Sequence, residues 1–266
     1  MNIELAGASG VGKTTALSHI SEVLYSSLQV ASGDLLLELM RDAEKQASNL
    51  HYTALADEGV VFLRDDFISE YLNRIQQMNG KDSQKINLVK FIDKHRKDFL
   101  VRQQLDVKHL LIDEGLVHAS FPLSQFSANL AQDVAFFFDN IPFPSVVIQL
   151  HAKPERILKR IKARGKTVNS YRYADDAVLL RRLGNVERYL ALMEQALSRR
   201  GCRVRHINAN GPVKEWSQAI MDTVSEEISH QTSGLQNAVA LNFNKASLSE
   251  KALGLDFSLP EDRHTS

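Results

Sequence analysis

The sequence has little that would indicate a secreted or membrane-embedded protein. Cys202 is the only cysteine among the 266 residues, which excludes an internal disulfide framework and a cysteine-rich metal site. Its position in an apolar, strand-like run predicts a buried thiol rather than a nucleophile. The sequence has no apolar stretch of membrane-spanning length, and no cationic start followed by a long apolar run. We therefore expect a cytoplasmic protein without a membrane segment.

An excess of either charge is also missing. Lysine plus arginine and aspartate plus glutamate number 32 each, so no global field attracts polyanions. No basic stripe interleaved with aromatic residues is present, which makes a nucleic-acid partner unexpected and a polynucleotide kinase a weak option. The 44% hydrophobic and 24% charged composition is that of an ordinary globular protein. Any preference for phosphate must therefore be local.

One such local feature is the stretch from Gly7 to Thr15, which matches the phosphate-loop pattern G-x-x-x-x-G-K-[ST] at every specified position. A predicted strand precedes it and a predicted helix follows, so that backbone N–H groups converge on phosphate oxygens. Lys13 is expected at the β- and γ-phosphates, Thr14 at Mg²⁺ and Thr15 at an inner phosphate. The alternative is a glycine-rich turn that binds nothing. It is disfavoured because Lys13 and Thr14 stand at the Lys and Ser/Thr positions of the motif. The predicted nucleotide-binding residues are Gly7, Ser9, Gly10, Val11, Gly12, Lys13, Thr14 and Thr15.

A second local feature is the apolar run 108–113, which ends in Asp113 and is followed by Glu114. This is the form of a Walker B strand, because a parallel core strand is expected to carry an ionisable residue only at its carboxyl end. Asp113 is predicted to hold Mg²⁺ through water or to act as general base, and Glu114 is the alternative base.

The order of the elements predicts an α/β fold with a doubly wound parallel sheet of about five strands, of the P-loop NTPase type. Residues 1–229 are predicted to form a kinase-like domain, with a helical insertion at about 50–106 and a short lid at about 165–172. The tail 230–266 either stays flexible or docks a short helix, and it is the expected contact for a protein partner. Strands are predicted at 2–6, 29–34, 108–113, 145–150 and 202–209, and helices at 14–28, 35–46, 56–78, 85–105, 121–138, 155–164, 175–200 and 213–228.

Four segments together resemble the nucleoside-monophosphate kinases, and most closely adenylate kinase. They are 31–36, 111–113, 146–164 and 171–189, and the resemblance covers about 1–50 and 108–212. It implies that Arg160 covers the adenine of ATP. It also implies that Arg164, Arg172 and Arg182 (or Arg181) clamp the transferring phosphoryl group. Guanidinium groups suit phosphate oxygens, although each arginine taken alone could belong to a solvated basic face.

The acceptor half departs from the family pattern. Leu37 stands where an acceptor-phosphate arginine is expected, and Glu114 lies near a second such position. Asp34 and Arg41 are the remaining candidate acceptor residues, since Arg41 lies one helical turn beyond Leu37. A carboxylate opposes a phosphate dianion but suits a hydroxyl group. We therefore expect AMP to be a poor acceptor. The lid has no cysteine tetrad, so no structural zinc is implied.

The sequence thus predicts an ATP- and Mg²⁺-dependent kinase that phosphorylates a nucleotide, a nucleoside or another small hydroxyl acceptor. The alternative is a regulatory P-loop ATPase that acts through a protein partner. A GTP-specific switch is less favoured, because an Asn-Lys-x-Asp sequence is missing.

Overall fold

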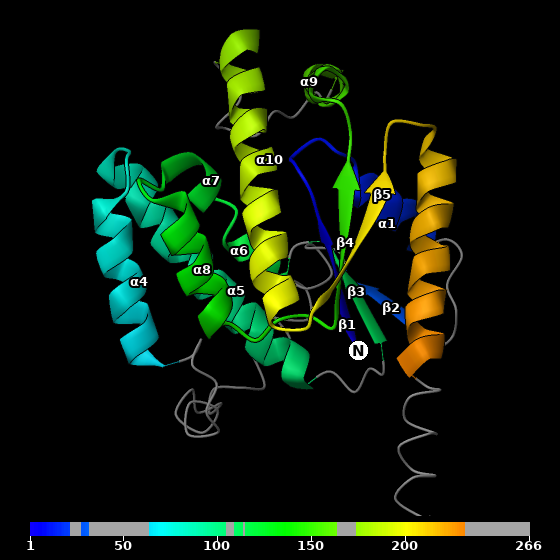
Figure 1. Ribbon diagram of the computed structural model, residues 1–266, viewed down its shortest axis with the longest axis horizontal. Coiled ribbons are helices and arrows are strands. Elements are labelled where there is room, and N and C mark those ends of the chain that lie inside the picture. Colours follow the sequence, from blue (N-terminus) through cyan, green and yellow to red (C-terminus); the bar gives the residue numbers. More distant parts are fainter. Residues whose placement is uncertain (22–27, 32–63, 105–108, 114, 164–173, 232–266) are drawn as a thin grey trace, which may run out of the picture. The chain divides into compact units, whose positions relative to one another are not determined.

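The computed structural model describes residues 1–21, 28–31, 64–104, 109–113, 115–163 and 174–231 (Figure 1). The chain divides into a compact unit, Met1–Val224, and a second unit, Ser225–Ser266. Within the described ranges, no helix is long and apolar enough to cross a membrane.

The first unit is built on one parallel sheet. Its strands are β1 (Asn2–Ala6), β2 (Leu28–Ala31), β3 (His109–Ile112), β4 (Val146–His151) and β5 (Arg203–Asn208). They lie in the order β2-β3-β1-β4-β5, and every neighbouring pair is parallel. The strand order reverses beside β1, and open α/β sheets bind ligands at the carboxyl ends of strands at such a point. The predicted five-stranded, doubly wound sheet of the P-loop type is confirmed.

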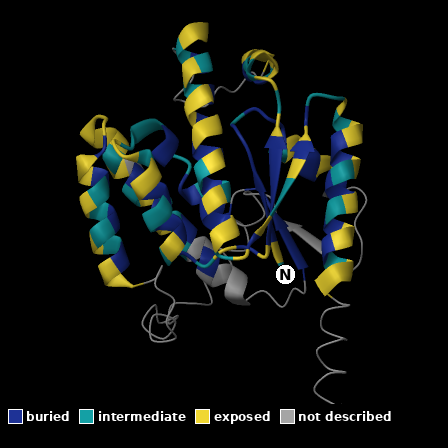
Figure 2. Cartoon of the chain, in the orientation of Figure 1, coloured by how far each residue is buried: buried dark blue, intermediate teal, exposed yellow. Residues whose placement is uncertain are grey.

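The central strands are buried on both faces, as parallel strands covered by helices must be. All four residues of β3 and the first five of β4 are buried, whereas β5, at the edge, is mostly half-buried or exposed (Figure 2). The buried part of β1 is apolar except for one carboxylate, Glu4.

Helices cover the sheet. They are α1 (Lys13–Ser21), α4 (Asp65–Gln77), α5 (Asp82–Gln104), α6 (Leu116–Ala119), α7 (Leu123–Phe126), α8 (Leu130–Asn140), α9 (Pro154–Ala163) and α10 (Asp176–Arg199), followed by a helix at 213–231. In Figure 1, α10 runs along one face of the sheet and α1 lies on the other. The long helix α10 packs against α7, α8, α9 and β5, while α5 packs on α6 and α4 on α8.

The single helix predicted at 121–138 is wrong. The chain instead forms α7 and α8 with a break at 127–129, and α6 precedes them. The Ser127 hydroxyl accepts from the Asn129 backbone N–H at 3.1 Å and donates to Asp133 at 2.6 Å. Such local side-chain hydrogen bonds compete with the helical ladder. Ser127 is held in an extended conformation with ψ 132°, which ends α7 and restarts the helix at Leu130.

Candidate functional site

The phosphate loop connects β1 to α1 in the conformation that the motif requires. All three of its glycines have positive φ, with values of 141°, 88° and 118° at Gly7, Gly10 and Gly12. The loop is tightened by a hydrogen bond from the Val11 N–H to the Ala8 carbonyl at 3.1 Å. Ser9 is half-buried within the loop, while Thr14 and Thr15 are exposed at the start of α1. The predicted loop is therefore formed directly before the N-terminus of a helix, an arrangement that can bind phosphate.

Gly12 packs closely against a side chain from a distant part of the sequence. A Cβ atom at this position would lie 2.8 Å from Cη2 of Trp216, closer than any real Cβ contact. Trp216 is 2% exposed and belongs to the helix that begins at residue 213. The buried indole ring therefore packs against the loop at Gly12, where a residue larger than glycine would clash with it.

Lys13 and Thr14 both contact groups that a nucleotide site would use. The Lys13 ammonium donates to the Gly7 carbonyl at 2.9 Å, so it spans the loop on which phosphates would rest. The Thr14 hydroxyl donates to Oδ2 of Asp113 at 3.2 Å, although the two residues are 99 positions apart. Asp113 follows β3 directly and is 4% exposed. Hydroxyl and carboxylate oxygens are ligands that Mg²⁺ prefers, so this pair fits the predicted metal.

Arg160 ties the loop to the neighbouring edge of the sheet. Its guanidinium donates to the Val11 carbonyl at 2.6 Å and to the Ala209 carbonyl at 2.8 Å. The carbon Cζ also lies 6.0 Å from the centre of the Trp216 ring. The structure brings Arg160 to the loop, as predicted, but its hydrogen bonds go to backbone. A contact with adenine stays a prediction.

Aromatic and imidazole rings of α5, α6 and Phe121 lie close together. His118 of α6 lies 5.6 Å from Phe91, 6.2 Å from His95 and 5.6 Å from Phe121, measured between ring centres. Burial, and then the nearby charges of Lys13 and Lys94, lower the pKa of His118 to about 3. The imidazole is therefore neutral at pH 7. Lys13 is among the charges near His118, and α5 packs on α6. We call the rings of Phe91, His118 and Phe121 the ring-lined wall.

The remaining predicted residues are less completely placed. Arg182 lies half-buried in the second turn of α10, which packs against α9, and its role stays a prediction. Asp34, Arg41, Glu114, Arg164 and Arg172 lie outside the described residues, as does the predicted lid.

Two buried residues near this site, Trp216 and Glu4, were not predicted from the sequence. Trp216 lacked any local signal, because its contact with Gly12 joins distant parts of the chain. Glu4 carried a signal that could have found it. A carboxylate in the middle of a strand that is buried on both faces must have dedicated hydrogen-bond donors.

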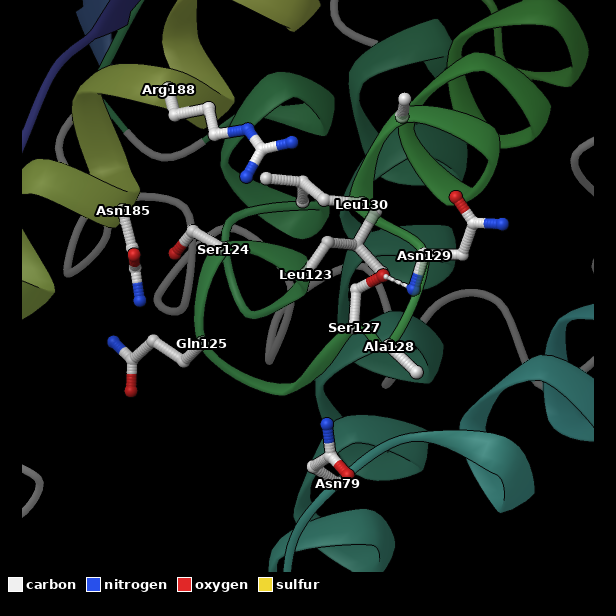
Figure 3. Close-up of a pocket in the computed structure, with 11 residues that line it drawn as sticks. Asn79, Leu123, Ser124, Gln125, Ser127, Ala128, Asn129, Leu130, Asn185 and Arg188 are labelled. Atoms are coloured by element: carbon white, nitrogen blue, oxygen red, sulfur yellow. Dashed lines mark hydrogen bonds between the residues drawn. The ribbon is translucent and has the colours of Figure 1, made fainter.

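A separate hollow of about 370 Å³ lies among α7, α8 and α10. In Figure 3, Arg188 lies at one end of it and Asn79 at the other. Arg188 is the charged residue of its lining, and none of the predicted site residues lines it. We therefore assign the candidate site to the phosphate loop and not to this hollow. Its lining consists of Asn79, Leu123, Ser124, Gln125, Ser127, Ala128, Asn129, Leu130, Ala131, Asn185 and Arg188.

Comparison with known protein families gives no match, and neither does comparison with curated proteins. Among solved structures, the chain is similar to deoxyadenosine kinase from M. mycoides in three forms. With dCMP and a flexible dCDP bound, the TM-score is 0.45 and the identity 15%, over 85% of this chain and 100% of that one. For the form with dATP, the TM-score is 0.46 and the identity 15%, over 85% of this chain and 99% of that one. For the form with dCTP, the TM-score is 0.45 and the identity 13%, over 85% of this chain and 100% of that one. A likeness of this size carries no argument about substrate, and the narrower resemblance to adenylate kinase stays a prediction.

Proposed function

We propose that this protein is an ATP- and Mg²⁺-dependent kinase that transfers the γ-phosphoryl group of ATP to a small hydroxyl-bearing acceptor. The observation that carries the proposal is the hydrogen bond between Thr14 and Asp113. It joins the phosphate loop to the acid after β3, and these are the two halves of a nucleotide·Mg²⁺ site in P-loop proteins. A glycine-rich turn without a ligand would not require a buried carboxylate at this point.

The chain's own residues supply most of what phosphoryl transfer needs, since this reaction depends on positioning and charge stabilisation. The loop N–H groups hold the phosphates of ATP. Lys13 exchanges its contact with the Gly7 carbonyl for the β- and γ-phosphates. Bound Mg²⁺ would neutralise charge that develops on the phosphate oxygens.

Asp113 or Glu114 accepts the proton of the acceptor hydroxyl. The hydroxyl oxygen forms a bond to the γ-phosphorus while the bond from that phosphorus to the β–γ bridging oxygen breaks. ADP leaves with the electron pair of that bond.

The ring-lined wall supports an acceptor without a phosphate group. The half-buried rings of Phe91, His118 and Phe121 offer flat surface, with the His118 imidazole neutral, and Lys94 lies near His118. A monophosphate dianion needs several fixed cations in a desolvated cleft. The surface suits a nucleoside or a sugar better than it suits AMP, with ring stacking as the main attraction.

A panel of acceptors tests the proposal. ADP release is measured with ATP and Mg²⁺ in the presence of nucleosides, sugars or nucleoside monophosphates, against a background without acceptor. We expect at least one unphosphorylated acceptor to raise ADP release above background and above the rate with AMP. Lys13→Ala should lower that rate by about 10²–10³, because it removes a fixed cation from the transferring phosphate.

Two results would contradict this proposal. Efficient conversion of AMP to ADP, abolished by Arg41→Ala, would restore an ordinary nucleotide kinase. ADP release that no acceptor changes would support the regulatory ATPase instead.

A further inference from the structure

Glu4 lies in the middle of β1 and is 3% exposed. Burying a carboxylate is costly unless hydrogen bonds compensate it. Here the Leu116 N–H donates to Oε1 at 2.9 Å, and the Val117 N–H donates to Oε2 at 2.8 Å. Both oxygens therefore hold the backbone of α6, which begins three residues after Asp113.

Gly115 makes this contact possible. A Cβ atom at this position would lie 2.0 Å from Cδ of Glu4 and 2.2–2.3 Å from its two carboxylate oxygens. Its backbone has φ −97°, which other residues also adopt. The glycine is thus required by space and not by conformation, and Glu4 and Gly115 form one packing unit.

The same segment is held from its other side by α10. The Tyr189 hydroxyl lies 2.5 Å from the Ser120 hydroxyl and donates to the Val117 carbonyl at 3.1 Å. Tyr189 and Ser120 are both fully buried. The segment 115–120 is therefore fixed between β1 and α10.

Asp113 needs such an anchor, because the strand ladder does not reach it. The pairing of β3 with β1 ends at Ile112, which is opposite Glu4. The Asp113 carboxylate must still stay beside the Thr14 hydroxyl. A fixed backbone at Leu116 and Val117 limits how far the preceding residues can move.

We propose that Glu4 is a positioning residue of the metal site: together with Gly115 it fixes the backbone after Asp113, so that this carboxylate stays in place for nucleotide-bound Mg²⁺. This inference rests on the proposed function. Glu4 itself touches neither nucleotide nor metal. Groups that orient a metal ligand typically change metal affinity by about 10–100-fold when they are replaced.

The test is the Mg²⁺ affinity of the protein bound to the non-hydrolysable analogue AMPPNP, measured by calorimetry. Glu4→Gln keeps the shape of the side chain, but its amide nitrogen cannot accept one of the two N–H groups. We expect Mg²⁺ affinity to fall at least about tenfold, with AMPPNP affinity in EDTA within twofold of wild type. Gly115→Ala, which displaces the carboxylate, should reproduce this split and decides the question if Glu4→Gln does not fold.

The matched control is Asp133→Asn on α8. Asp133 is another buried carboxylate, bonded to Arg74 at 3.0 Å and to Ser127, and its loss should lower the melting temperature without changing Mg²⁺ affinity. Wild-type Mg²⁺ affinity in folded Glu4→Gln or Gly115→Ala would overturn the inference, as would an equal loss in Asp133→Asn. If the wild type itself does not bind AMPPNP with Mg²⁺, the proposed function falls and the inference falls with it.

Discussion

Arg160 has a structural role that was not predicted from the sequence. It donates to the carbonyls of Val11 and Ala209, and so it links the phosphate loop to the turn after β5. Hydrogen bonds from a charged donor are roughly twice as strong as neutral ones. Lysine could not span both carbonyls, because it lacks the planar fork. Arg160 therefore holds the loop in place, and its contact with the nucleotide stays a prediction.

His118 makes stability depend on pH. Its pKa is about 3 in the folded protein, lowered by burial first and then by Lys13 and Lys94, against about 6.5 in the unfolded chain. Between these two values the unfolded state binds more protons, so stability is lost as pH falls below 6.5. At pH 5.5, the titration of His118 lowers the free energy of unfolding by at most about 1.4 kcal/mol.

Urea unfolding at pH 7.0, 6.0 and 5.5 measures this effect. His118→Asn should show a smaller loss of unfolding free energy with falling pH than the wild type. An identical pH dependence in the two proteins would mean that His118 titrates normally. His19, exposed on α1, provides the control: His19→Asn should behave as wild type does.

Among the elements, the phosphate loop packs against a side chain from a distant part of the sequence, Trp216. Gly12 has φ 118°, and a Cβ atom there would lie 2.8 Å from the Trp216 ring, so Gly12→Ala combines backbone strain with a clash. Strain of this kind costs about 1–3 kcal/mol. We expect the variant to unfold at lower urea concentration and to bind ATP more weakly.

Gly184→Ala is the matched control for this change. Gly184 lies inside α10 with nothing within 4 Å of the added Cβ, so alanine should stabilise the helix by about 0.5–1 kcal/mol. Equal unfolding midpoints for Gly12→Ala and Gly184→Ala would contradict this description of the loop.

The elements also show where sequence reasoning succeeds. The loop, the strand before it and the acid after β3 were predictable, because motif spacing and apolar runs are local signals. The prediction of one helix at 121–138 was wrong, because the apolar residues there fit a helical period. A local hydrogen bond between Ser127 and Asn129 interrupts the helix. The spacing of apolar residues does not reveal that side-chain hydrogen bonds compete with the backbone hydrogen bonds of a helix.

At the scale of the whole molecule, the strand order brings the parts of the site together. β1 and β3 are neighbours in the sheet although more than 100 residues separate them, and their carboxyl ends carry the phosphate loop and Asp113. This meeting was predictable from the parallel fold. The contacts of Glu4 with α6 and of Trp216 with Gly12 were not, because they depend on which side chains the three-dimensional packing places in contact.

The central claim is that the phosphate loop and Asp113 form one nucleotide·Mg²⁺ site, and it is tested most directly by calorimetric titration of the wild-type protein with AMPPNP in Mg²⁺ and in EDTA. We predict tighter binding in Mg²⁺, and the loss of that difference in Asp113→Asn, whose amide replaces the oxygen paired with Thr14. Wild-type protein that binds no nucleotide at millimolar concentration, or an Asp113→Asn variant that keeps the full effect of Mg²⁺, would contradict the claim.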